Sequence, residues 1–145
     1  MSNDRPRTQP IGLHVQRVAK VLNRAFEDEL VAAGGSVPMW LILVSLKSGR
    51  PETQRELASA VGIKGATMTH HLDALEKAGL VTRGRDPSNR RVQRVQLTAE
   101  GDAAFDRLRK VAIKFDKRLR EGLSEQELSS VSQVLDRLAA NASRP

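Results

Sequence analysis

The side chains best suited to chemistry in this sequence are cationic, and they gather in one short stretch. Residues 83–94 contain five arginines and a single acid, Asp86. A guanidinium group binds phosphate oxygens through paired N–H donors, and an arginine at a hairpin tip can enter the minor groove of DNA, where the potential is most negative. A charged hairpin can also be a solvated edge that prevents aggregation. We predict that this stretch contacts DNA, through Arg90 first and Arg91 second.

The residues just before this stretch have the spacing of a helix-turn-helix. Gln54 is followed at four-residue steps by Ala58 and Gly62, and Ile63 and Met68 complete the pattern. Ala58 has to be small because the second helix crosses over it, and Gly62 permits the positive φ of a tight turn. Ile63 and Met68 fill the angle between the two helices. A helical hairpin without a DNA-binding role can show parts of this pattern, so the basic stretch that follows is what favours DNA.

The second helix of this motif is expected to present one polar side to DNA. At about 100° per residue, the buried stripe centres on Met68 and Leu72, which leaves Ala66 and His70 on the opposite side. His71 falls on the apolar side, where we expect a packed, hydrogen-bonded core histidine rather than a ligand. Recognition helices contact bases with their first turns. The predicted DNA-binding residues are Lys64, Gly65, Ala66, Thr67, Thr69 and His70 from the helix, with Arg83, Arg85, Arg90 and Arg91 from the hairpin.

Some of these assignments have simpler alternatives. Thr67 and Thr69 can each be a capping or surface residue instead of a base contact. The helix over 64–77 is neutral, because its two lysines are balanced by two acids. Most of the electrostatic affinity for DNA is therefore expected in the hairpin.

The preceding elements must hold this motif in place. From Ile11 the apolar residues recur at steps of three and four until two consecutive glycines, which predicts a helix over 11–34. Residues 38–46 are apolar on every side, so we expect a short central helix that other elements surround, with Ser36 as its N-cap. A capping box at 53–56 opens the helix-turn-helix.

Two strands and two long helices complete the chain. We expect strands at 81–85 and 91–97 around a type I turn at 86–89. In the two closing helices, which together span 99–142, apolar residues repeat at steps of three and four, as in the narrow seams of coiled coils. The predicted fold class is mainly α with a small β-hairpin wing (α+β).

The domain organisation follows from these elements. We expect one domain over residues 11–145, because 145 residues supply a single core. Its winged helix-turn-helix lobe covers 36–98, and the helices over 11–34 and 99–142 form a dimerisation body. Residues 1–10 are polar and are expected to be a flexible arm.

Composition narrows the function classes. The net charge is +7 and the sequence pI is near 10.5, which predicts attraction to polyanions such as nucleic acid. Cysteine is absent, so disulfides and thiolate metal sites are excluded, and a reducing cytoplasm is the expected compartment. The longest apolar run is much shorter than the roughly 20 residues that cross a bilayer. No nucleophile–base pair or metal-ligand cluster can be assembled, so we expect neither an enzyme nor a bound cofactor or metal.

Three segments resemble the signature of the MarR family of transcriptional regulators. They are Leu75-Glu76-Lys77-Ala78-Gly79-Leu80-Val81, Arg85-Asp86-Pro87-Ser88-Asn89-Arg90-Arg91 and Val95-Gln96-Leu97-Thr98-Ala99-Glu100-Gly101. The resemblance extends to nearly the whole chain, including the helices before and after the motif. Relatives often carry arginine in the recognition helix where this chain has His70, which leaves the operator sequence open.

The resemblance implies more than the residue patterns do. It implies an obligate homodimer with interlocked terminal helices, and a cleft beside each DNA-binding lobe for a small aromatic or phenolic effector. Asp86 would support the wing by pairing with Arg90 or Arg91. The residues expected at the effector cleft are His14, Arg17, Trp40 and Val44, although for Trp40 an ordinary core position is the preferred interpretation.

The expected function is therefore a DNA-binding transcriptional regulator. We expect a ligand-responsive repressor that binds a palindromic operator as a homodimer, with double-stranded DNA as its partner and no membrane association. One alternative is a non-specific architectural DNA-binding protein, which shares the charge but needs no effector cleft. A regulator of another winged-helix family is the other.

Overall fold

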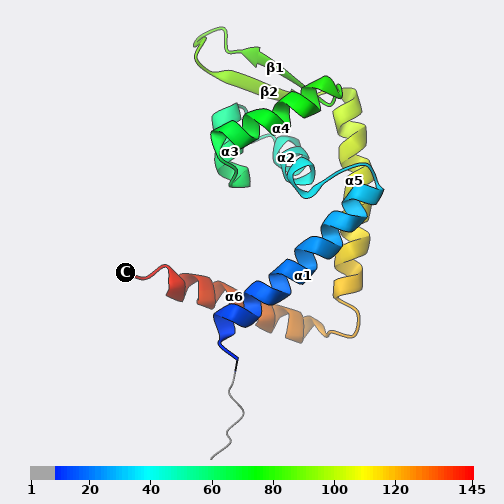
Figure 1. The fold of residues 1–145 in the computed structure, drawn as a ribbon, viewed down its shortest axis with the longest axis vertical. Helices are drawn as coiled ribbons and strands as arrows, with labels where there is room; N and C mark the ends of the chain where they lie inside the picture. Colours follow the sequence, from blue (N-terminus) through cyan, green and yellow to red (C-terminus); the bar gives the residue numbers. More distant parts are fainter. Residues whose placement is uncertain (1–8) are drawn as a thin grey trace, which may run out of the picture. The chain divides into compact units, whose positions relative to one another are not determined.

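A computed structural model describes residues 9–145, which form six helices and one two-stranded hairpin (Figure 1). The elements are α1 (Ile11–Ala32), α2 (Val37–Lys47), α3 (Gln54–Val61), α4 (Gly65–Lys77), β1 (Val81–Arg85), β2 (Gln93–Leu97), α5 (Ala99–Leu119) and α6 (Glu125–Ala142). The predicted fold class is confirmed. The arm predicted over residues 1–10 lies outside the described residues, except that Pro10 precedes the first turn of α1.

Polar caps mark the starts of α2, α3 and α6, whereas α1 and α4 have no side-chain cap. Ser36 accepts a hydrogen bond from the backbone N–H of Met39 at 3.2 Å, and complete capping boxes stand at Thr53 and Ser124. Gly62 ends α3 with a φ of 75°, which places the turn of the helix-turn-helix where the spacing predicted it. The helix starts are set locally because each cap satisfies backbone N–H groups that the helix itself leaves free.

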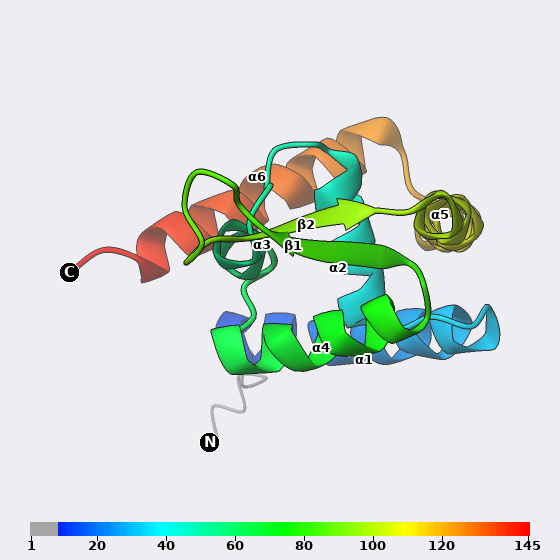
Figure 2. The same cartoon turned by 90° about the horizontal axis from the view of Figure 1, so that it is seen from above.

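The DNA-binding lobe is built around a core that α2, α3, α4 and the hairpin share. Leu57 of α3, Met68 and Leu72 of α4 and Ile42 of α2 are fully buried, and Val81 and Val95 of the hairpin close the cluster. Figure 2 shows α4 beside the hairpin, with α2 crossing behind them. This core fixes α3, α4 and the strands against one another.

The opposite side of α2 packs against α1 and the first turns of α5. Leu43 is fully buried there with Leu30, Leu108 and Ala104. Leu41 and Val44 remain 40% and 37% exposed, so the expectation that other elements surround α2 on every side was wrong for these two residues. Among the helices within residues 9–145 none alone has the length and apolarity to cross a bilayer, and only α1 with α2, bent by 81°, passes that test as a pair.

The hairpin is shorter on its second strand than predicted. β1 and β2 are antiparallel, with Val81 opposite Leu97 and Arg85 opposite Gln93. Arg91 lies in the loop and not in the strand, because the N–H of Val92 donates to the carbonyl of Asn89 at 2.9 Å and continues the turn. The turn at 86–89 is present, with the Asn89 N–H donating to the Asp86 carbonyl at 3.2 Å.

The chain divides into two compact units within α5, after Val111. The first turns of α5 belong with the lobe because Ala104 and Leu108 pack against α1 and α2. The second unit contains the rest of α5 and α6, and α6 buries none of its residues.

Candidate DNA-binding surface

The first turns of α4 are exposed, as a DNA-contacting helix requires. Lys64 is the N-cap of α4, and the six helix residues predicted to bind DNA, from Lys64 to His70 without the core residue Met68, are all exposed. Met68 and Leu72 anchor the opposite side in the core, while His71 is half-buried. The two sides of α4 are thus divided as the helical periodicity predicted.

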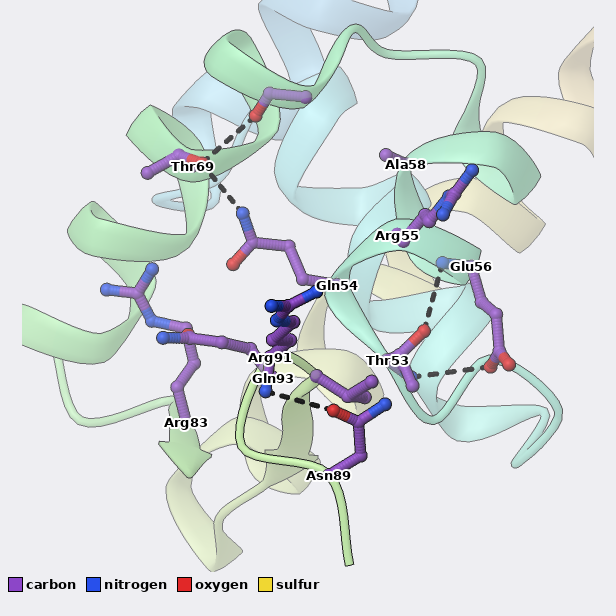
Figure 3. Close-up of a pocket in the computed structure, with 12 residues that line it drawn as sticks. Thr53, Gln54, Arg55, Glu56, Ala58, Thr69, Arg83, Asn89, Arg91 and Gln93 are labelled. Carbon is purple, nitrogen blue, oxygen red and sulfur yellow. Dashed lines mark hydrogen bonds between the residues drawn. The ribbon is translucent and has the colours of Figure 1, made fainter. Parts of the chain in front are cut away.

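A hollow of about 950 Å³ lies between α3, the start of α4 and the hairpin (Figure 3). Four predicted DNA-binding residues line it: Gly65, Thr69, Arg83 and Arg91. Sequence reasoning missed the others that line it with polar side chains: Thr53, Gln54, Arg55, Glu56, Asn89 and Gln93. For the residues at the start of α3 the helix-turn-helix pattern contained a signal, because it brings the start of its first helix beside the first turn of its second.

Gln54 and Thr69 form one hydrogen-bonded unit across the helix-turn-helix. The Gln54 amide donates to the Thr69 hydroxyl at 2.7 Å, and that hydroxyl donates to the Gly65 carbonyl at 3.0 Å (Figure 3). The hydroxyl of Thr69 is therefore engaged on both sides. Its methyl group and the remaining donor and acceptor of the Gln54 amide are the groups left to meet a base edge or a phosphate.

The wing, defined here as residues 81–97, holds its arginines in different ways. The guanidinium of Arg83 lies against Asp73 and Glu76 of α4, and its side chain is only 14% exposed. Arg85 donates to the backbone carbonyl of Arg90 at 3.1 Å, which braces the loop. Arg90 and Arg91 are exposed. Asp73 and Glu76 therefore neutralise part of the positive charge of the wing. Most of the positive charge that can still contact DNA is on the exposed loop arginines, Arg90 and Arg91.

Asp86 pairs with Arg94, not with Arg90 or Arg91 as the family resemblance suggested. The Arg94 guanidinium donates to the Asp86 carboxylate at 2.8 and 2.9 Å and to Glu52 at 3.1 Å. The positions on the hairpin explain this pairing. Asp86 directly follows β1 and Arg94 lies on the neighbouring strand β2, whereas Arg90 and Arg91 lie in the loop between the strands. The N–H of Val95 also donates to the Glu52 carbonyl at 3.1 Å, so this pairing ties the wing to the α2–α3 connection.

Comparison with known proteins places this winged lobe in a family. The MarR family model matches residues 36–92, which contain α2, α3, α4, β1 and the wing loop. A solved structure of the transcriptional regulator PA3341 is 31% identical, with a TM-score of 0.78 over 92% of this chain and 98% of that one. The chain belongs to the MarR family. It is a transcriptional regulator with a winged helix-turn-helix fold.

Two other solved structures are similar to this MarR-family regulator. A transcriptional regulator (MarR family) from Rhodococcus sp. RHA1 is 28% identical, with a TM-score of 0.76 over 91% of this chain and 96% of that one. The transcriptional repressor CouR, solved bound to a 23-mer DNA duplex, is also 28% identical, with a TM-score of 0.82 over 90% and 93%. These relatives are regulators of transcription, which favours the non-enzymatic role expected from the sequence.

The carboxylate of Asp86 organises the wing loop of the regulator. It accepts hydrogen bonds from the Ser88 hydroxyl at 2.6 Å and the Ser88 N–H at 2.8 Å, in addition to those from Arg94. These donors favour the charged form, and together they lower the pKa of Asp86 from 3.8 to about 2. A carboxyl with a lowered pKa stabilises the fold above its unfolded-state pKa, and the stabilisation is lost as the pH falls toward the folded-state value.

We therefore expect the stability difference between wild type and Asp86→Asn to depend on pH. The difference in urea midpoint should be largest well above pH 3.8 and should shrink between 3.8 and about 2. Ser88→Ala removes the hydroxyl donor that lowers the pKa of Asp86 most, so in this variant the stabilisation from Asp86 should be smaller and its loss should be complete at a higher pH than in wild type. Urea denaturation followed by circular dichroism measures all three proteins. A midpoint difference that stays constant over this interval would show that Asp86 is not held in its charged form by the loop.

The four residues predicted at an effector cleft lie on α1 and α2. His14 and Arg17 are exposed, Val44 is partly exposed, and Trp40 is half-buried with its ring stacked on Phe105, centroids 5.7 Å apart. A separate hollow of about 450 Å³ lies beside His71 and is lined by other residues: Gly34, Ser36, Met39, Ala74, Leu75, Ala78, Leu80 and Arg107. Binding by the four named residues stays a prediction.

Proposed function

We propose that this regulator binds double-stranded DNA as a homodimer and acts as a repressor at a palindromic operator. One observation carries the proposal: exposed residues from the first turns of α4 and the exposed loop residue Arg91 line the same hollow, so a helix and a wing are presented together. α4 would lie in the major groove, and Arg90 and Arg91 would contact the phosphates or the minor groove beside it. A cytoplasmic location follows from this role.

The homodimer is supported by the surface of α6. Among the described residues, α6 buries none of its side chains, and Val131, Val134 and Leu135 on its apolar stripe are 44% to 55% exposed. Apolar stripes of this size on a helix need a covering surface, and a second copy supplies an identical one through a twofold axis. Two recognition helices would then lie about one DNA turn apart, roughly 34 Å, which requires an imperfect palindrome.

Repression is supported by the relative CouR, a transcriptional repressor solved on a DNA duplex and 28% identical to this chain. A dimer that occupies a promoter excludes polymerase by its bulk. An effector would act by favouring one spacing of the two lobes, and a tenfold loss of DNA affinity needs about 1.4 kcal/mol of coupling.

The effector we propose is a small aromatic or phenolic anion. His14 and Arg17 offer hydrogen-bond donors or positive charge, while Trp40 and Val44 offer aromatic and apolar surface. That combination suits a ring that carries a carboxylate or phenolate. DNA binding by the regulator does not require that this effector exists.

Replacing Arg90 is the direct test of DNA binding through the wing. We expect Arg90→Ala to weaken binding to every duplex and to lower the slope of log K against log salt concentration by about 0.9, because one phosphate contact is lost. Fluorescence anisotropy at several salt concentrations, on a duplex selected by the wild-type protein from a random pool, measures the slope. An unchanged slope would remove Arg90 from the interface.

His70→Ala provides the contrast to the wing variant. Because His70 is exposed on the first turns of α4, its loss should change the preferred sequence and not the general affinity. Equal losses on selected and random duplexes would assign His70 to a phosphate. The same competition separates a regulator from an architectural DNA-binding protein, since a regulator should prefer its operator by roughly 10³ or more.

A further inference from the structure

Arg83 has a different environment from the other wing residues predicted to bind DNA. It lies on β1, at the junction between the wing and the recognition helix, and its guanidinium is turned toward α4 (Figure 3). Its side chain is 14% exposed, whereas Arg85, Arg90 and Arg91 are exposed residues. A phosphate of a bound duplex would have to compete with the partners that already surround this guanidinium.

Those partners are two carboxylates one turn apart on α4. The Arg83 guanidinium bonds the Asp73 carboxylate and lies 3.3 and 3.4 Å from the two oxygens of Glu76. The backbone N–H of Arg83 also donates to Glu76 at 3.1 Å. Both the side chain and the main chain of β1 are therefore fastened to the same helix. The planar fork of arginine can serve both carboxylates at once, which the single ammonium of lysine does less well.

The electrostatics agree with this geometry. Hydrogen bonding to Glu76 raises the pKa of Arg83, and hydrogen bonding to Arg83 lowers the pKa of Glu76. Asp73 and Glu76 would otherwise place two negative charges on the recognition helix, close to the phosphates. With Arg83 paired to both, one of these two negative charges is offset within the protein.

We propose that Arg83 is a positioning residue: by holding Asp73 and Glu76 of α4 against β1, it fixes the wing at a set distance and angle from the recognition helix. This inference rests on the proposed function and assigns Arg83 a role different from the direct DNA contact predicted from the sequence. Fixing the two DNA-contacting elements before binding removes the ordering cost from the binding step. It also fixes the number of base pairs between the helix contact and the wing contact.

The test compares Arg83→Lys with Arg83→Ala on the duplex selected by wild type. Lysine keeps the charge but loses the fork, so a positioning role predicts that both variants weaken binding by about tenfold, with a salt slope equal to that of wild type. A phosphate contact predicts that lysine retains most of the affinity and that alanine lowers the slope by about 0.9. Melting curves report whether each variant is folded.

A second comparison uses variants on the other side of the contact. Asp73→Asn combined with Glu76→Gln removes two negative charges near DNA, so general electrostatics predicts tighter binding at low salt. The positioning role predicts weaker binding at about 0.2 M salt, where those long-range effects are largely screened. It also predicts that this variant tolerates an extra base pair inserted between the helix contact and the wing contact, which wild type should reject.

Weak binding by both Arg83 variants at an unchanged slope, together with relaxed spacing in the carboxylate variant, supports the proposal. A lysine variant that binds as tightly as wild type, or any drop in slope, overturns it. A wild-type protein that shifts no duplex overturns the proposed function instead. In that case, hydrogen exchange at the backbone amide of Arg83 still tests the contact between the helix and the wing. Faster exchange in Glu76→Gln than in wild type would show that Glu76 holds β1 against α4.

Discussion

Gly101→Ala is expected to unfold the regulator or to lower its free energy of unfolding by roughly 3 kcal/mol or more. A Cβ placed on Gly101 would lie 1.9 Å from the carbonyl oxygen of Leu80 and 3.1 Å from a methyl group of Leu97. The Leu80 carbonyl cannot move away freely, because it accepts the N–H of Thr98 at 3.1 Å. The Thr98 hydroxyl, which donates to the Gly79 carbonyl at 2.6 Å, fastens the same junction.

Gly65→Ala is the matched control for this variant. Gly65 also lies in the first turn of a helix, and a Cβ there would meet no atom within 4 Å. Alanine has the higher helix propensity, so the control should be neutral or more stable by up to about 1 kcal/mol. Urea denaturation of the three proteins measures the difference. If the two variants were equally stable, the close approach of α5 to the start of the hairpin would have no energetic consequence.

Leu135→Arg should have the largest effect on DNA binding. Leu135 is 44% exposed on the apolar stripe of α6, and a charge there cannot be buried against a second copy. We expect a monomer at micromolar concentration. Affinity for the full palindrome should fall by about 10²–10⁴, because the second half-site would no longer be bound intramolecularly. Sedimentation velocity gives the oligomeric state, and anisotropy on full and half sites gives the two affinities.

Gln133→Arg introduces the same charge on the other side of α6, about 160° from Leu135. Because the added charge is equal in both variants, any general gain in attraction to DNA cancels in the comparison. The control should remain dimeric and bind the full palindrome as wild type does. A dimeric Leu135→Arg protein, or a control that dissociates as well, would show that this face of α6 is not the contact between copies.

Most of the fold was predictable because it is encoded in local patterns. Ser36, Thr53 and Ser124 each satisfy an N–H group within three residues of themselves, so the starts of α2, α3 and α6 needed no tertiary information. The start of β2 was predicted two residues too early, since Arg91 and Val92 follow a turn whose hydrogen bonds are not visible as a composition change. The exposure of Leu41 and Val44 was missed because an apolar sequence does not say what covers each side of a helix.

The candidate site was only partly predictable, because its polar residues come from separate segments. The first turns of α4 and the loop arginines followed from the pattern of the motif and its basic hairpin. Asn89 and Gln93, which line the same hollow, became visible only when α3, α4 and the wing were brought together. Their side chains carry no charge, so the count of arginines gave no reason to select them.

The sequence by itself determined the order of the elements, the helix-turn-helix, the basic wing and membership of the MarR family. Only the tertiary structure decided which arginines are available to DNA. A count of charges is a property of the chain, but neutralisation depends on which charges meet, and the partners of Arg94 and Arg83 come from elsewhere in the fold. Glu52 is 42 residues from Arg94, and Asp73 reaches Arg83 from the recognition helix. Folding therefore engages those two arginines in holding the wing and leaves Arg90 and Arg91 exposed.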